Sequence, residues 1–141
     1  MTSDWSWDTA HKTTGSGVII IKKISGNWKP LGLWAYGGFD ISKGHVEDGD
    51  DVFKTALREM VEETGISEVK FEWGKDCIRL NNLFVYLAST KQDPKIIFNN
   101  EEGIFEHEFA KWIEWEEMKE KCYDYLLPAI EWAERKTCNS K

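Results

Sequence analysis

GHVEDGDDVFKTALREMVEETGI, residues 44–66, is a glycine-containing loop followed by a helix that ends on glycine. Asp50 or Asp51 can accept hydrogen bonds from the free amides of the first helical turn, and a negative charge suits the positive end of the helix dipole. Gly65 supplies the left-handed residue that commonly closes a helix. The stretch therefore predicts one helix, with clear start and stop signals.

Apolar residues recur at four-residue steps along this helix and define one face that we expect to be buried. They are Val52, Phe53, Ala56, Leu57, Met60 and Val61. Glu59, Glu62 and Glu63 stand at i, i+3 and i+4, which brings their side chains within roughly 5–6 Å of one another. A run of acids is usually a solvated helix face. Divalent cations such as Mg²⁺, however, bind several carboxylate oxygens and would turn this repulsion into ligation.

The whole stretch resembles the Nudix box, GX5EX7REUXEEXGU, in which U is aliphatic. Eight positions of the box are in register: Gly44, Arg58, Glu59, Met60, Glu62, Glu63, Gly65 and Ile66. Asp50 departs from the pattern, because the family has glutamate there as a partner of the arginine. The shorter side chain implies a looser orientation of Arg58, or a substitute such as Asp51 or Glu47.

The resemblance implies an α/β fold, the Nudix α/β/α sandwich, in which helices flank a mixed β-sheet. We expect an N-terminal arm over residues 1–14 with Trp5 and Trp7, one domain over 15–136 and a tail over 137–141. The β-branched run at 18–21 is typical of a buried central strand. Further strands are expected at 31–35, 71–80, 83–89, 95–98 and 110–115, with tight turns at 25–27 and 81–82, a loop at 36–41, and a helix over 116–136 interrupted before Pro128.

The length and the net charge of the chain limit the classes of function that are possible. A chain of 141 residues is one domain of ordinary size. Its formal net charge of −7 disfavours binding to duplex nucleic acid. Three cysteines, Cys77, Cys122 and Cys138, form neither a CxxC pair nor an even disulfide set, so we expect reduced thiols and a cytoplasmic protein. We find no signal peptide and no apolar run long enough for a membrane span.

The resemblance also assigns the site residues. Two or more Mg²⁺ or Mn²⁺ ions would be held by Glu59, Glu62 and Glu63 with the carbonyl group of Gly44. The family commonly takes one more acid from a later loop, as ligand or general base. Glu108 is expected in that role and Glu106 is the alternative, although single acids in loops are ordinary. The expected catalytic residues are Glu108, Glu62 and Arg58.

The string Lys43-Gly-His-Val-Glu47 resembles the KGHVE of diadenosine tetraphosphate hydrolases, although Ser42 replaces the usual proline. The four-residue spacing from Glu108 to Trp112 is similar to a loop of the same subgroup. Lys43 and His45 are therefore expected to contact substrate. Tyr86 and Tyr125 are expected to stack on a base, with Phe84 and Tyr123 as further candidates; packing in the core is the ordinary role of such aromatic residues.

The resemblance implies a metal-dependent pyrophosphohydrolase of nucleoside diphosphate-linked substrates, first of all dinucleoside polyphosphates. Alternative substrates within the family are RNA 5′ ends, ADP-ribose or NADH, and nucleoside triphosphates. An alternative of another class is a Nudix-fold sensor that binds a nucleotide without cleaving it. The expected partner is a small nucleotide, and either a monomer or a homodimer is compatible with the sequence.

Overall fold

The computed structural model describes residues 14–95, 98–99, 104–105 and 107–138. The expected N-terminal arm lies outside the described residues except for Thr14, and so do Trp5 and Trp7.

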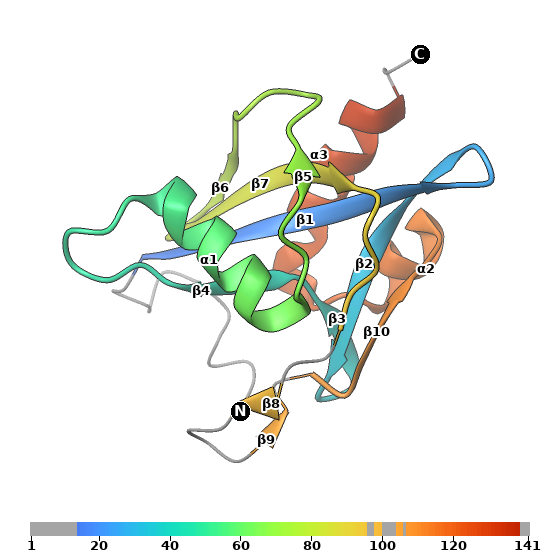
Figure 1. Ribbon diagram of the computed structural model, residues 1–141. Coiled ribbons are helices and arrows are strands. Elements are labelled where there is room, and N and C mark those ends of the chain that lie inside the picture. Colours follow the sequence, from blue (N-terminus) through green and yellow to red (C-terminus); the bar gives the residue numbers. More distant parts are fainter. Residues whose placement is uncertain (1–13, 96–97, 100–103, 106, 139–141) are drawn as a thin grey trace.

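Within the described residues, eight strands form one mixed sheet and two short strands form a separate pair (Figure 1). The order across the large sheet is β10-β2-β1-β7-β5, with β3 beside β2, β4 beside β1 and β6 beside β7. The strands are β1 (Gly15–Ile24), β2 (Asn27–Ala35), β3 (Gly38–Asp40), β4 (Ser42–His45), β5 (Val69–Lys70), β6 (Ile78–Leu80), β7 (Leu83–Thr90) and β10 (Phe109–Trp112), and the separate pair is β8 (Phe98–Asn99) with β9 (Ile104–Phe105).

Strand β1 is the centre of the sheet. Its first half pairs antiparallel with β4, its second half pairs antiparallel with β2, and its other edge runs parallel to β7. Val18 and Ile20 point to one face of the sheet, whereas Ile19 and Ile21 point to the other. All four are at most 2% exposed, which confirms the predicted buried central strand.

Helices cover both faces of this sheet. Helix α1 (Val52–Thr64) packs on the face of Val18 and Ile20. The other face is covered by α2 (Trp115–Lys121), the 3₁₀ helix η2 (Asp124–Leu126) and α3 (Leu127–Cys138). Figure 1 shows α1 in front of the sheet and α3 behind it. The predicted α/β sandwich with a mixed sheet is confirmed.

Three expectations about strands need correction. The expected loop at 36–41 contains β3, which pairs with the end of β2. The expected strand at 71–80 is a strand only from Ile78, because the preceding segment is a loop in which Trp73 packs edge-on against Trp28. The last strand ends at Trp112, and the chain has already entered α2 at Trp115.

The C-terminal helix is interrupted earlier than expected. The break comes at Cys122 and Tyr123, where the backbone N–H of Tyr123 donates to the carbonyl oxygen of Phe39, 3.1 Å away. Pro128 is the second residue of α3, a position where proline removes no helical hydrogen bond. No helix among the described residues combines the length and the apolar character needed to cross a membrane.

Candidate functional site

Helix α1 begins and ends at the predicted signals. The carboxylate of Asp51 accepts a hydrogen bond of 2.9 Å from the backbone N–H of Lys54, and Gly65 closes the helix with a φ of 74°. The hydroxyl of Ser16, in β1, donates to the carbonyl oxygen of Val52 at 2.6 Å. The first turn of the helix is thereby fixed on the central strand.

The buried face of α1 differs from the predicted apolar face. Val61 is 43% exposed, whereas Thr55 and Thr64 are buried. Thr64 can be buried because its hydroxyl donates to the carbonyl oxygen of Met60 at 2.6 Å. The face that carries Glu59 and Glu63 therefore lies at the edge of the packed face, next to β4.

Glu59 lies directly against Gly44. A Cβ atom at residue 44 would overlap the side chain of Glu59 at its carboxyl carbon. The side chain of Glu59 is 17% exposed, so the carboxylate is largely enclosed between the helix and the strand. Glycine is therefore needed at residue 44 because it leaves room for a carboxylate.

Glu63 reaches the neighbouring residue of the same strand. Its Oε1 atom accepts a hydrogen bond of 3.2 Å from the backbone N–H of Lys43. Two acids from successive turns of α1 thus meet β4 at consecutive residues, Lys43 and Gly44. The structure brings these predicted ligands together at one strand.

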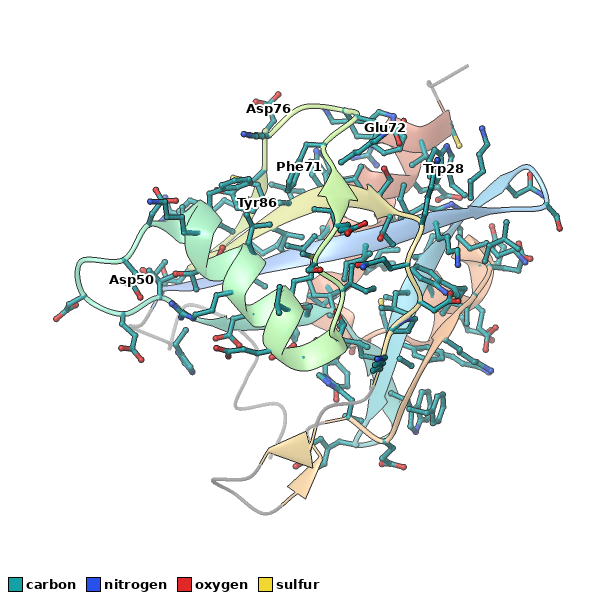
Figure 2. All side chains as sticks on the ribbon, in the orientation of Figure 1. Trp28, Asp50, Phe71, Glu72, Asp76 and Tyr86 are labelled. Atoms are coloured by element: carbon teal, nitrogen blue, oxygen red, sulfur yellow. The ribbon has the colours of Figure 1, made fainter. Side chains whose placement is uncertain are left out.

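Arg58 lies on the outer side of this group and contacts three carboxylates. Its guanidinium nitrogens are 3.4 Å from Asp50 Oδ2, 3.6 Å from Glu59 Oε2 and 3.9 Å from Glu62 Oε2. We call these four residues the Arg58 cluster. Partial burial opposes the charge of Arg58, but the hydrogen bond to Asp50 and the nearby carboxylates outweigh it and raise the pKa of Arg58. Figure 2 shows Asp50 in the loop that leads into α1.

Glu62 projects outward, and its side chain is 59% exposed. Across the part of the chain that the structure describes, no three carboxylate, imidazole or thiol side chains are grouped closely enough to hold a metal ion. The oxygen chemistry of Glu59, Glu62 and Glu63 suits Mg²⁺ or Mn²⁺. Glu59 and Glu63 already lie at one strand, and the exposed side chain of Glu62 is free of the packing that would prevent its rotation.

A buried ion pair joins Lys43, in the strand that these acids contact, to Asp40 at the end of β3. Lys43 Nζ is 2.7 Å from Asp40 Oδ2, and the two side chains are only 9% and 8% exposed. Burial alone would raise the pKa of Asp40, but the Lys43 ammonium keeps that pKa below its usual value. Burial likewise opposes the charge of Lys43, yet Asp40 outweighs it and raises the pKa of Lys43. Both side chains are therefore charged, and we call them the buried pair.

His107, the residue before Glu108, contacts the same buried pair. His107 is 7% exposed, and its Nε2 atom is 3.8 Å from Asp40 Oδ2. Glu108 itself is exposed, and its backbone N–H donates to the carbonyl oxygen of Trp34 at 2.8 Å. Glu106, the alternative acid, lies outside the described residues.

Tyr125 also lies next to the buried pair. Its hydroxyl is buried, and the Lys43 ammonium lies close enough to act on it. Burial raises the pKa of Tyr125, and Lys43 counteracts part of that rise. The ring stacks on Tyr123 with 6.3 Å between ring centroids. Tyr123 in turn donates its hydroxyl to the carbonyl oxygen of Ala35.

The other predicted substrate contacts lie elsewhere. Tyr86 is 6% exposed, and its ring packs edge-on against Phe53 in the core between α1 and the sheet (Figure 2). Phe84 is half-buried under the guanidinium of Arg79, which is 5.1 Å from the ring centroid. His45 ends β4 and is half-buried opposite Gly15.

Reasoning from the sequence missed Asp40 and His107. The available signal for Asp40 was an acid between two large apolar residues, Phe39 and Ile41, three positions before a lysine. An acid in such a setting is rarely buried without a charged partner, and Lys43 could have been named. The signal for His107 was weaker, because its contact with Asp40 joins segments far apart in the chain.

Comparison with known proteins agrees with the resemblance of residues 44–66 to the Nudix box. The family model described as the NUDIX domain matches residues 10–133. A curated relative, Nudix hydrolase 6 of Arabidopsis thaliana, is 37% identical over 49 residues, which are 35% of this chain. The match spans only 16% of the length of that relative.

Solved structures share the fold. An Ap4A hydrolase of C. elegans, in a binary complex, has a TM-score of 0.71 at 22% identity, covering 89% of this chain and 99% of that one. The E. coli dihydroneopterin triphosphate pyrophosphohydrolase has a TM-score of 0.65 at 19% identity, covering 84% and 92%. Because the family model matches most of the sequence, from residue 10 to residue 133, the chain belongs to the Nudix hydrolase family.

Proposed function

We propose that this chain is a divalent-metal-dependent pyrophosphohydrolase of nucleoside diphosphate-linked substrates. The observation that carries the proposal is the meeting of Glu59 and Glu63 with β4 at consecutive residues, where Gly44 leaves room for a carboxylate. An acidic surface of this kind binds a pyrophosphate only if cations lie between the two. The proposed ligands are Glu59, Glu62 and Glu63, the carbonyl group of Gly44, and Glu108.

The donors are all oxygens, which are the ligands that Mg²⁺ and Mn²⁺ prefer. The chemistry that such ions supply when bound is neutralisation of the diphosphate and activation of water. Glu59 and Glu63 are largely fixed by their contacts with β4, whereas Glu62 and Glu108 are exposed and can adjust to a ligand. A site with two or more ions would need all of them.

The protein side chains have distinct tasks in this proposal. Glu108, or a glutamate of the box, accepts the proton of the attacking water. Arg58 orients the carboxylates of Glu59 and Glu62 through the contacts described above. Attack at one phosphorus atom then releases a nucleoside phosphate and the remaining phosphorylated product. The roles of Lys43, His45 and Tyr125 in binding substrate stay predictions.

Among substrates, we infer that dinucleoside polyphosphates such as diadenosine tetraphosphate come first. The KGHVE string and the spacing from Glu108 to Trp112 support this choice. The similarity to the C. elegans Ap4A hydrolase is compatible with it but, at 22% identity, concerns the fold alone. RNA 5′ ends, ADP-ribose, NADH and nucleoside triphosphates are the competing substrates.

The test is a panel of these substrates incubated with Mg²⁺, with Mn²⁺ and with a chelator, followed by chromatography of the products. We expect cleavage of diadenosine tetraphosphate to exceed that of the other compounds and to stop in the chelator. Faster cleavage of another compound would reassign the substrate and keep the reaction.

A nucleotide sensor is the second candidate, and one observation favours it. The three box acids are not gathered into a metal cluster among the described residues, since Glu62 points outward. A sensor would bind members of the panel in calorimetry and cleave none of them with either metal ion. That result would replace hydrolysis with binding as the function.

A further inference from the structure

Asp40 has both carboxylate oxygens engaged. Oδ1 accepts a hydrogen bond of 2.7 Å from the backbone N–H of Ile41, and Oδ2 is 2.7 Å from Lys43 Nζ. The residue ends β3 and is 6% exposed. Its side chain therefore has one fixed orientation, determined by its own backbone on one side and by β4 on the other.

The connection continues from Lys43 to the acids of the box. The backbone N–H of Lys43 donates to Glu63, and the next residue, Gly44, is the one against which Glu59 lies. The main chain of Lys43 is also held in the sheet opposite Gly17. An anchored Lys43 thus fixes the surface that both carboxylates contact.

A second connection leads from Asp40 to Glu108. His107, the residue before Glu108, is buried with its Nε2 atom 3.8 Å from Asp40 Oδ2. The box and the later loop are far apart in the sequence, yet the same carboxylate lies between them. Asp40 therefore contacts Lys43, which precedes the box, and His107, which precedes Glu108.

Burying a charged pair is costly, and apolar side chains of similar volume often stabilise a fold as well or better. The buried pair is therefore poorly explained by stability alone. We propose that Asp40 is a positioning residue, which anchors Lys43 and His107 so that the box acids and Glu108 face one metal site. This inference rests on the proposed function. It also gives Lys43 a structural task, because its charge is already matched by Asp40.

Asp40→Asn is the direct test, since asparagine keeps the shape and the bond from Ile41 but removes the charge. The probe is Mn²⁺ alone, with the free ion measured by electron paramagnetic resonance, which requires no turnover. We expect Mn²⁺ affinity to fall about 10-fold, the lower end of the loss when the direct partner of a metal ligand is removed, because Asp40 acts through the neighbours of the ligands. We also expect kcat to fall more than KM changes at saturating metal. Wild-type Mn²⁺ affinity in a folded variant would overturn the proposal.

The matched control is Asp93→Asn. Asp93 also pairs with a lysine, at 2.6 Å from Lys22 Nζ, but its side chain is 72% exposed. We expect Mn²⁺ affinity within about twofold of the wild type, because exposed ion pairs contribute little. An equal loss in both variants would mean that any broken ion pair disturbs the site, and would overturn the role of Asp40.

A second variant covers the case in which Asp40→Asn does not fold. Asp40→Leu combined with Lys43→Met replaces the buried pair by apolar side chains, a change that proteins often tolerate. If this variant folds and still loses Mn²⁺ affinity, positioning is supported. If it binds Mn²⁺ like the wild type, the buried pair has no positioning role.

The same measurements separate this inference from the proposed function. A wild-type chain that binds Mn²⁺ but cleaves no member of the panel refutes hydrolysis, while the Mn²⁺ affinities of the variants still decide the role of Asp40. A wild-type chain that neither binds Mn²⁺ nor cleaves the panel refutes both.

Discussion

The Arg58 cluster and the buried pair are two charged groups on either side of one strand, and they differ in almost every physical property. The contacts of Arg58 measure 3.4 to 3.9 Å, and its side chain is 42% exposed. The contact between Asp40 and Lys43 is 2.7 Å and almost completely buried. Water screens the first group and leaves its exposed carboxylates, Asp50 and Glu62, adjustable, whereas the second group is held in one geometry. A site that must accept ions and release products needs an adjustable side supported by a fixed one.

The largest effect is expected at Glu63, one of the two box acids that contact β4. Glu63→Gln removes one negative charge from the proposed metal site and should lower hydrolysis by at least about 100-fold, the range for loss of transition-state charge stabilisation. Turnover of the best substrate measures the effect, and thermal unfolding should show an intact fold. Glu116→Gln, at a side chain that is 88% exposed on α2, is the control and should retain full activity. Unchanged turnover in Glu63→Gln would place the ligands elsewhere.

The contact between the helix and the strand can be tested through stability. Gly44→Ala forces a methyl group into the carboxyl group of Glu59 and should reduce the free energy of unfolding by about 1–3 kcal/mol, as overpacking usually does. Urea unfolding measures the change. In a Glu59→Ala background the same substitution should cost clearly less, because the overlapping atoms are gone. An equal cost in both backgrounds would show that Glu59 does not lie against residue 44.

A smaller effect, on the free energy of unfolding, is expected at high pH from Tyr123, which lies next to the buried pair. Burial, together with the charge of Asp40, raises the pKa of Tyr123 to about 12. The unfolded chain loses this proton near about pH 10, the usual value for tyrosine. Between these two pKa values only the unfolded state is ionised, so stability should fall as the pH rises from about 10 to 12. Urea midpoints across this range should fall less steeply in Tyr123→Phe, and an unchanged slope would contradict this linkage.

The smallest effect is expected at the position where the box departs from its pattern. Asp50→Glu lengthens the side chain by one methylene, which should bring the carboxylate closer to Arg58 than the present 3.4 Å. Because the pair is half-exposed, the gain in unfolding free energy should stay below about 1 kcal/mol and shrink in high salt. Asp50→Ala should have the opposite sign. A large gain that persists in salt would mean that the Arg58 cluster is less adjustable than its exposure indicates.

Local signals in the sequence predicted the centre of the fold. The β-branched run at 18–21 could be assigned as a buried strand, and Asp51 and Gly65 mark the ends of α1, since each signal acts within a few residues. The family and the α/β sandwich followed from the box and are confirmed. The roles of the site residues stay predictions, although the structure places Glu59 and Glu63 at one strand.

The errors arose where distant contacts override local composition. The aromatic segment before Ile78 looked like a strand, but Trp73 is used to pack on Trp28 from a loop. The three-residue strand β3 depends on pairing with β2, which no local pattern reveals. The buried pair was missed for the same reason. Asp40 and Lys43 are close in the sequence, but only the layers around them exclude the water that would otherwise surround both charges.

The parallel pairing of β1 with β7 has a consequence for synthesis of the protein. Residues 15–21 are translated well before their partner on that edge, residues 83–89. Until β7 is translated, one edge of a strand rich in isoleucine has open backbone hydrogen-bonding groups. Such long-range pairing forms slowly and leaves nascent chains prone to aggregation. Newly made chains are therefore expected to be most prone to aggregation before residues 83–90 are available to enclose this edge of β1.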